Sequence, residues 1–124
     1  MKEAVIVSGA RTPIGKAKKG SLATVRPDDL GAICVKETLK RAGGYEGNID
    51  DLIIGCATPE AEQGLNMARN IGALAGLPYT VPAITVNRYC SSGFSLLHMQ
   101  QKKLCWAPTI QRSPAEQNPC RKFR

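Results

Sequence analysis

The sequence predicts an α/β protein in which helices cover the faces of a mainly parallel β-sheet. Three short apolar runs, at residues 4–8, 52–54 and 83–86, have the length and composition of buried strands. Segments with helix-starting and helix-ending residues follow these runs, so the predicted order is β-α-β-α-β-α. The chain of 124 residues is long enough for one small domain with a modest core.

The first predicted strand, Ala4–Ser8, is followed by a loop rich in glycine and proline and then by a helix. The loop, residues 9–16, does not match a phosphate-binding loop, because five residues separate its glycines and neither Ser nor Thr follows Lys16. The helix is predicted to begin at Pro27, with acidic residues in its first turn, and to end at the glycine pair 43–44.

The second and third predicted strands flank a second predicted helix. Residues 52–54 form the second strand, and the helix covers about residues 66–75, where Gly76 supplies an ending. The third strand, residues 83–86, leads directly to a polar turn that contains Cys90. Functional residues of parallel sheets gather at the carboxyl ends of strands, and Cys90 occupies a position of that kind.

The local pattern around Cys90 has two interpretations. Two serines and a glycine follow Cys90, as is typical of a helix N-terminus, whose positive end stabilises a thiolate. Strand, turn, cysteine and helix together form an arrangement that produces a nucleophile. The alternative is a small buried hydrophobic side chain, the usual place of a free cysteine, and local spacing on its own favours this alternative.

Charge and cysteine content limit the classes of function. The formal net charge is +7, but residues 1–93 hold 11 Lys and Arg against 9 Asp and Glu, whereas residues 94–124 hold 6 against 1. The body lacks a basic stripe, so we expect no nucleic-acid partner. The sequence shows neither a membrane span nor a signal peptide, which predicts a cytoplasmic protein without a membrane partner. The five cysteines are expected to be reduced thiols without metal-ligand spacing.

Three segments carry a family pattern. They are EAVIVSGARTPIG at residues 3–15, QGLNMAR at residues 63–69 and VNRYCSSG at residues 86–93. In this order and spacing they resemble the thiolases, the acyl-CoA C-acyltransferases, and the resemblance covers residues 1–93. It implies an incomplete thiolase-like fold, the first β-α-β-α-β-α half of a family fold in which two similar halves pack together.

The resemblance gives Cys90 the role of nucleophile. It implies that Cys90 takes the acyl group from an acyl-CoA as a thioester, which a second acyl-CoA or free CoA then attacks. Acyl-CoA and CoA are thus the expected partners, as substrates in fatty acid metabolism. No cofactor is expected, and the parent family is homo-oligomeric. The β-ketoacyl synthases, condensing enzymes with a reactive cysteine on a related fold, are an alternative, although residues 10–13 and 66–69 favour a thiolase.

The family's other catalytic groups have no counterpart in this chain. The resemblance implies a Gly-His-Pro histidine that activates the nucleophile and a second cysteine that acts as acid and base. His98 is the only histidine, and at roughly 12 Å along a helix from Cys90 it is too far away to contact it. Cys105 and Cys120 lie outside any family motif. We therefore expect no thiolase activity from this chain alone.

Residues 94–124 depart from the family pattern and are expected to be an irregular or disordered tail on a partial N-terminal domain, residues 1–93. Back-translation of residues 94–121 allows codons whose other frame reads QSIAYAAEKIMLGAYDTAIAGGAESMS, a good thiolase continuation. The hypothesis is that one base was lost near codon 94 and that the tail is read out of frame. The alternatives are a genuine divergent tail and, with it, a small basic binding protein that acts through this tail.

Overall fold

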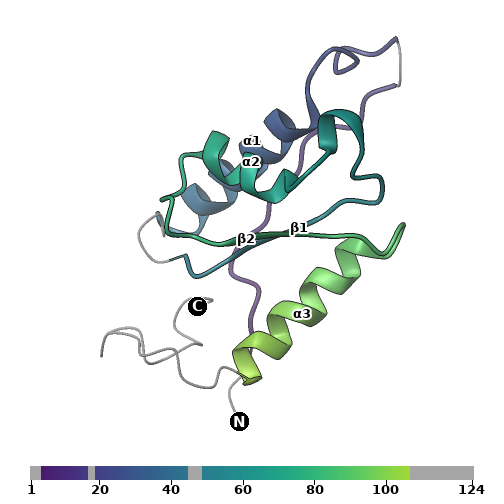
Figure 1. Ribbon diagram of the computed structural model, residues 1–124. Helices are drawn as coiled ribbons and strands as arrows, with labels where there is room; N and C mark the ends of the chain where they lie inside the picture. The colour runs from purple at the N-terminus through teal and green to yellow at the C-terminus, as the bar shows by residue number, and fades with distance from the viewer. Residues whose placement is uncertain (1–3, 17–18, 45–48, 107–124) are drawn as a thin grey trace.

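The computed structural model describes residues 4–16, 19–44 and 49–106 (Figure 1). The elements follow one another as helix α1, strand β1, a short 3-10 helix η1, helix α2, strand β2 and helix α3. Their bounds are Pro27–Arg41, Leu52–Gly55, Ala61–Gln63, Met67–Ala75, Ala83–Val86 and Ser92–Trp106.

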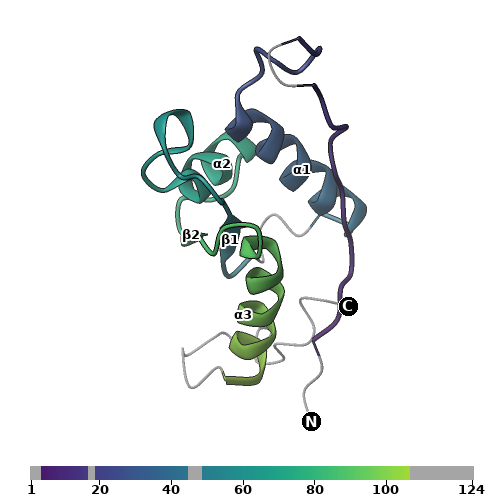
Figure 2. The same ribbon diagram turned by 90° about the vertical axis from the view of Figure 1, so that its right-hand side faces the viewer.

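The two strands form a parallel pair that separates the helices into two layers. Leu52 lies opposite Ala83, and Gly55 lies opposite Val86. Helices α1 and α2 cover one face of the pair and α3 covers the other (Figures 1 and 2). The predicted α/β class, with a parallel sheet between helices, is therefore confirmed.

Helices α1 and α2 begin and end close to where the sequence predicts. Pro27 stands at the start of α1, where a missing N–H costs no hydrogen bond, and acidic residues occupy the first turn. Helix α2 begins after Asn66, whose side-chain oxygen accepts the N–H of Arg69 at 3.3 Å. It ends at Gly76, which has the left-handed conformation (φ +81°) typical of a helix C-terminus.

Helix α2 supplies the centre of the core. Ile71 is 1% exposed and packs with Met67 and with Cys56, the residue that follows β1. A Cβ at Gly31 of α1 would lie 2.6 Å from Cδ1 of Ile71, so the glycine allows the two helices to approach closely. Three partly buried side chains complete the cluster, namely Val35, Leu52 and Ile54.

The predicted strand Ala4–Ser8 is not formed. The segment is extended, but it passes alongside α1 and pairs with neither strand (Figure 2). Its described anchor is a hydrogen bond from Oγ of Ser8 to the carbonyl of Thr38 at 2.9 Å. Ile6 remains 80% exposed, so the apolar run gains little of the burial that favours strand formation.

Helix α3 extends further than the sequence analysis expects. Residues 94–106 were expected to be irregular, but they continue the helix that begins at Ser92, and the expectation is wrong for these residues. They include no Gly or Pro, and Leu, Met, Gln and Lys are good helix formers. Residues 107–124, the remainder of the expected tail, lie outside the described residues.

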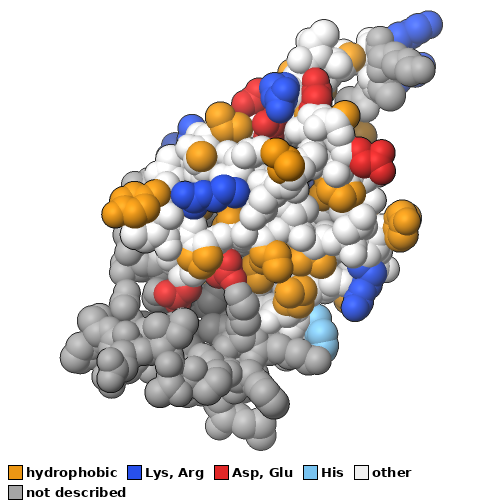
Figure 3. Space-filling model, viewed as in Figure 1, with side chains coloured by type: hydrophobic (Ala, Val, Ile, Leu, Met, Phe, Trp, Pro, Cys, Tyr) orange, Lys and Arg blue, Asp and Glu red, His pale blue; other side chains and the backbone are white. Residues whose placement is uncertain are grey.

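Helix α3 does not bury its apolar side chains on one stripe. Phe94 is 83% exposed and Leu97 is 52% exposed, although both lie in the first turns of the helix. Ile84 of β2 is also 42% exposed. Hydrophobic side chains are accordingly visible on the surface in Figure 3. A helix that covers a sheet normally directs such residues toward the sheet, so the sequence of α3 matches its position poorly.

The carboxyl end of β1 packs directly on the beginning of α3. A Cβ at Gly55 would lie 3.0 Å from both Cβ and the carbonyl carbon of Ser92, and 3.1 Å from the backbone nitrogen of Gly93. Two of these three atoms belong to the backbone, so they could not move aside without moving the helix. Glycine at position 55 therefore sets the distance between β1 and α3.

The ion pair at the start of α1 predicts a pH-dependent stability. Asp28 is buried and accepts two hydrogen bonds of 3.0 Å from the Arg26 guanidinium, which hold the pKa of its carboxyl below the usual range despite burial. A lowered carboxyl pKa adds stability above the ordinary Asp pKa, and this stability is lost as the pH falls through the folded-state pKa. We expect Asp28→Asn to lower the urea midpoint at pH 7, with the difference shrinking below about pH 4.

Asp29→Asn is the matched control, because Asp29 is exposed in the same first turn and shares the same helix dipole. It should have a smaller effect at pH 7. Equal urea midpoints for Asp28→Asn and the unmodified chain at pH 7 would contradict a stabilising role for the ion pair between Arg26 and Asp28.

The contact between Gly55 and α3 predicts a steric effect of a single methyl group. Gly55→Ala should lower the free energy of unfolding by roughly 1–3 kcal/mol, the usual cost of overpacking, measured by urea unfolding. Gly93→Ala is the control, because a Cβ there meets nothing within 4 Å and alanine favours a helix. If the two variants unfold at the same urea concentration, the close contact does not limit the packing.

Candidate active site

Cys90 lies in the turn that joins the carboxyl end of β2 to the start of α3. Strand β2 ends at Val86, and α3 begins at Ser92. The turn is closed by the N–H of Ser91, which donates to the carbonyl of Arg88 at 3.1 Å. The sequence prediction that a cysteine stands between a strand and a helix N-terminus is therefore confirmed for the backbone.

The Cys90 side chain is exposed and its thiol is free. The sequence-based alternative, a buried structural cysteine, is therefore wrong for Cys90. That alternative describes Cys56, which is 4% exposed and donates from its thiol to Oε1 of Gln63 at 3.3 Å. Within the described part of the chain, no side chain makes a hydrogen bond with the Cys90 thiol.

The residue before Cys90 has an unusual backbone conformation. Tyr89 has φ +46°, in the left-handed region that non-glycine residues rarely adopt. Its N–H donates to Oδ1 of Asn87 at 2.9 Å, and its carbonyl accepts the N–H of Ser92 at 3.1 Å. The turn is thus held by hydrogen bonds on both sides of Tyr89, and it directs the chain sharply from the strand into the helix.

Strand β2 is held in place by Asn66 at the start of α2, a residue predicted only to begin a helix and to belong to a family pattern. The Asn66 side-chain amide donates to the carbonyl of Ala83 at 2.9 Å. The Thr85 hydroxyl donates to Oδ1 of Asn66 at 3.0 Å and accepts the N–H of Ala68 at 3.0 Å. Sequence reasoning missed this role, because nothing local to Asn66 indicates which strand it contacts.

Arg69 adds a second connection to the segment before β2. Its guanidinium donates to the carbonyl of Val81 at 2.9 Å and to that of Tyr79 at 3.2 Å. An arginine bonded to two carbonyls on one segment fixes the direction from which that segment enters the strand. The pattern at residues 63–69 therefore acts structurally on β2, the strand that delivers Cys90.

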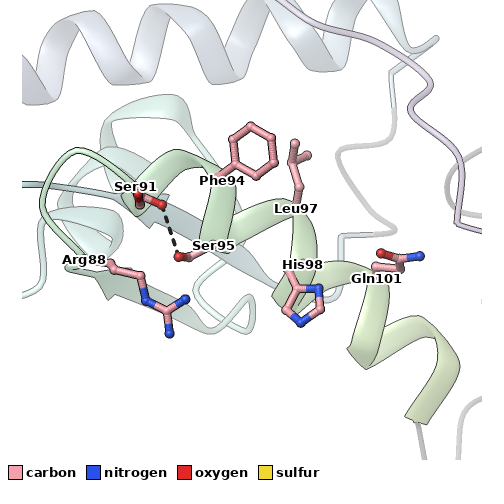
Figure 4. A pocket seen from close by; sticks show the side chains of 7 residues that line it. All are labelled: Arg88, Ser91, Phe94, Ser95, Leu97, His98 and Gln101. Carbon is pink, nitrogen blue, oxygen red and sulfur yellow. Dashed lines mark hydrogen bonds between the residues drawn. The ribbon is translucent and has the colours of Figure 1, made fainter.

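A shallow open hollow lies beside the turn. It is lined by Arg88, Ser91 and five residues of α3 (Figure 4). The side chains of Phe94 and Leu97 extend to one side of the helix, and those of Arg88 and His98 extend to the other (Figure 4). Cys90 does not line this hollow, so His98 and Cys90 do not share it.

The described residues contain neither a metal-binding cluster nor a membrane-spanning helix. Among the described residues, no group of three or more His, Cys, Asp and Glu side chains is arranged to hold a metal ion. None of the helices in residues 4–16, 19–44 and 49–106 is long and apolar enough to cross a membrane. The side chain of Cys105 and all of Cys120 lie outside the described residues.

Comparisons with known proteins place this chain among enzymes with the same sequence pattern. The family model described as "Thiolase, N-terminal domain" matches residues 4–107. The chain is 89% identical over 104 residues to a 3-ketoacyl-CoA thiolase of Bacillus subtilis, which is 84% of this chain and 27% of that relative. It is 50% identical over 98 residues to a 3-ketoacyl-CoA thiolase of Saccharophagus degradans, 78% of this chain and 25% of the relative.

A third relative, a 3-ketoacyl-CoA thiolase of Photorhabdus laumondii, is 44% identical over 99 residues, 79% of this chain and 26% of its own length. The chain thus spans about a quarter of the length of the curated relatives that it matches. The family model extends beyond Gly93, where the sequence analysis ends the resemblance. Of the two families that the sequence analysis raises, the comparisons support the thiolases. The chain belongs to the thiolase family and corresponds to part of its N-terminal domain.

Proposed function

We propose that this chain carries the nucleophile of a 3-ketoacyl-CoA thiolase and that Cys90 is this nucleophile. The supporting observation is the exposed thiol of Cys90 at the carboxyl end of a parallel strand, at the start of a helix. The relatives named above are 3-ketoacyl-CoA thiolases, so the proposed substrates are CoA thioesters of 3-oxo acids and free CoA.

In the proposed first step, the Cys90 sulfur attacks a carbonyl carbon of a CoA substrate, and a bond forms between Sγ and this carbon. In a 3-ketoacyl-CoA the attacked carbon is the 3-oxo carbon, so the bond between C2 and C3 breaks and the released carbanion takes a proton to give acetyl-CoA. In an acyl-CoA the attacked carbon is that of the thioester. For an acyl-CoA, the bond to the CoA sulfur breaks instead, and CoA leaves with the proton of the Cys90 thiol.

The proposed second step removes the acyl group from Cys90. Free CoA attacks the Cys90 thioester in the degradative direction, and a carbanion from a second acyl-CoA attacks it in the synthetic direction. Both directions need groups that move protons to and from the sulfur and carbon atoms. The resemblance assigns these groups to a histidine and a second cysteine that have no counterpart in this chain, so we propose that the chain alone does not turn over.

These two proposals predict acylation of Cys90 without catalysis. After incubation of the full 124-residue chain with excess acetyl-CoA, peptide mass spectrometry should find the acetyl thioester at Cys90 in preference to Cys34 and Cys56. Acetoacetyl-CoA and CoA should show no turnover above the buffer rate. Cys90→Ser should lose the thioester label and leave Cys34 and Cys56 unchanged.

Equal labelling of Cys34 and Cys90 would contradict the role of Cys90, because Cys34 is partly exposed and serves as an ordinary thiol in the same chain. Detectable thiolysis by the unmodified chain would overturn the proposed inactivity. A folded state is verified beforehand by the helical far-UV signal, so that absence of turnover is not simply absence of structure.

We also propose that residues from about 94 onward are read out of frame. The proposal is supported by the poor match of Phe94 and Leu97 to a helix that covers a sheet, and by the finding that codons for residues 94–121 can be chosen whose other frame reads like a thiolase. The proposal predicts that the DNA contains an open frame beside codon 94 that continues through a Gly-His-Pro histidine and a second cysteine. Sequencing the DNA of this region and translating it in all three frames tests the proposal. If no such frame exists, residues 94–124 are a genuine part of the protein.

A further inference from the structure

The turn that holds Cys90 depends on a backbone conformation that needs support. Tyr89, immediately before Cys90, has φ +46°, and its side chain is 77% exposed, so packing of the ring does not hold it. A left-handed tyrosine persists only where the surrounding structure fixes it. Groups of the surrounding structure must therefore fix the backbone on either side of Tyr89.

The Ser92 hydroxyl connects both sides of Tyr89. It accepts the N–H of Arg88 at 2.9 Å and donates to the carbonyl of Tyr89 at 2.7 Å. One hydroxyl thus uses an acceptor and a donor position on the peptide groups that precede and follow the left-handed residue. Ser92 is 4% exposed, so water does not compete for these hydrogen bonds.

Ser92 is itself held from the opposite side by β1. The close approach of Gly55 to Cβ and the carbonyl carbon of Ser92 leaves no room for this residue to shift toward the strand. Ser92 therefore lies between a fixed strand end and the turn. Its hydroxyl transmits the position of β1 to the N–H of Arg88 and the carbonyl of Tyr89, and hence to Cys90.

Ser91 and Ser95, the other two serines near the turn, do not connect the two sides of Tyr89 through their hydroxyls. Ser91 is exposed, and Ser95 donates its hydroxyl hydrogen to the carbonyl of Ser91 at 3.1 Å (Figure 4). The Ser95 bond runs along the helix and does not contact Arg88 or Tyr89. Ser95 is nevertheless buried, at 8% exposed, so it provides a matched control for the loss of a buried hydroxyl.

We propose that Ser92 is a positioning residue for Cys90, which holds the strained turn so that the thiol stays at the start of α3. This proposal rests on the proposed role of Cys90 as nucleophile. If the turn relaxes, the Cys90 thiol no longer keeps its exposed position at the start of α3, and we expect it to become less reactive. Ser92 does not touch the reacting atoms and acts only through the backbone.

The test is the rate at which iodoacetamide alkylates individual cysteines of the full chain at pH 7, followed by peptide mass spectrometry. Ser92→Ala should lower the Cys90 rate by roughly three- to tenfold, as expected for the loss of one or two modest hydrogen bonds. Ser92→Thr keeps the hydroxyl and should retain a rate close to that of the unmodified chain. Ser95→Ala should leave the Cys90 rate unchanged.

Cys56 provides an internal measure of folding in every variant, because its thiol is buried in the core. A lower alkylation rate at Cys90, with Cys56 still protected from iodoacetamide, supports the positioning role of Ser92. An unchanged or faster Cys90 rate in Ser92→Ala overturns it, as does a Ser92→Thr chain that reacts as slowly as Ser92→Ala while Cys56 stays protected. A Cys56 rate that rises together with the change at Cys90 also overturns it, in favour of a general structural role.

This experiment is independent of acyl transfer. If acetyl-CoA fails to acylate Cys90 while Ser92→Ala still slows alkylation, the proposed function fails and the positioning role stands. If acylation of Cys90 occurs and alkylation does not respond to Ser92→Ala, the proposed function stands and the positioning role fails.

Discussion

The packing of Ile71 between α1 and the strands is the contact on which the rest of the structure depends. Helix α2 has nine residues, too few for a stable isolated helix in water, so its stability comes from its buried face. Gly31 allows α1 to approach Ile71, and Leu52 and Ile54 approach it from β1. The cluster that Ile71 forms with Met67 and Cys56 thus joins the helical layer to the sheet, and its burial is the main apolar gain in a small core.

The position of Cys90 follows from this packing through a short series of contacts. Once α2 is packed on β1, its first residues present Asn66 and the N–H of Ala68 to β2. Strand β2 is then fixed both by its pairing with β1 and by hydrogen bonds to the start of α2. The turn at its end meets α3, whose beginning is placed by Gly55. Cys90, the proposed nucleophile, is therefore located by the ends of two strands and one helix, and by no feature of its own side chain.

The sequence predicts best those parts of the fold that local chemistry determines. Pro27, Asn66 and Gly76 mark helix boundaries by satisfying or omitting backbone hydrogen bonds, and the structure confirms them. The run at residues 4–8 has an equally good strand pattern, but a strand also needs a neighbouring edge, and pairing depends on distant parts of the chain. Periodicity alone could not supply that information.

The candidate site shows the same division between local and distant information. The position of Cys90 between a strand end and a helix start was predictable from residues 83–93, because a strand, a polar turn and a helix start follow one another directly. Its exposure was not, since local spacing on its own favoured a buried thiol. The roles of Gly55 and Ser92 were not predictable, since they depend on a contact between residues 37 positions apart in the sequence. Nothing in the local pattern distinguishes Ser92 from Ser91 or Ser95 before that contact is known.

The placement of Cys90 and the burial of α3 depend on different residues. The hydrogen bonds that hold the turn involve Asn87, Arg88, Tyr89 and Ser92, and the packing that fixes Ser92 comes from Gly55. All of these residues precede position 94, where the proposed change of reading frame begins. Beyond it, helix formers are sufficient to continue α3 without reproducing the face that a sheet would cover, which leaves Phe94 exposed. A chain altered after Gly93 can therefore retain the geometry around Cys90, the proposed nucleophile, while losing the apolar face with which α3 would cover the sheet.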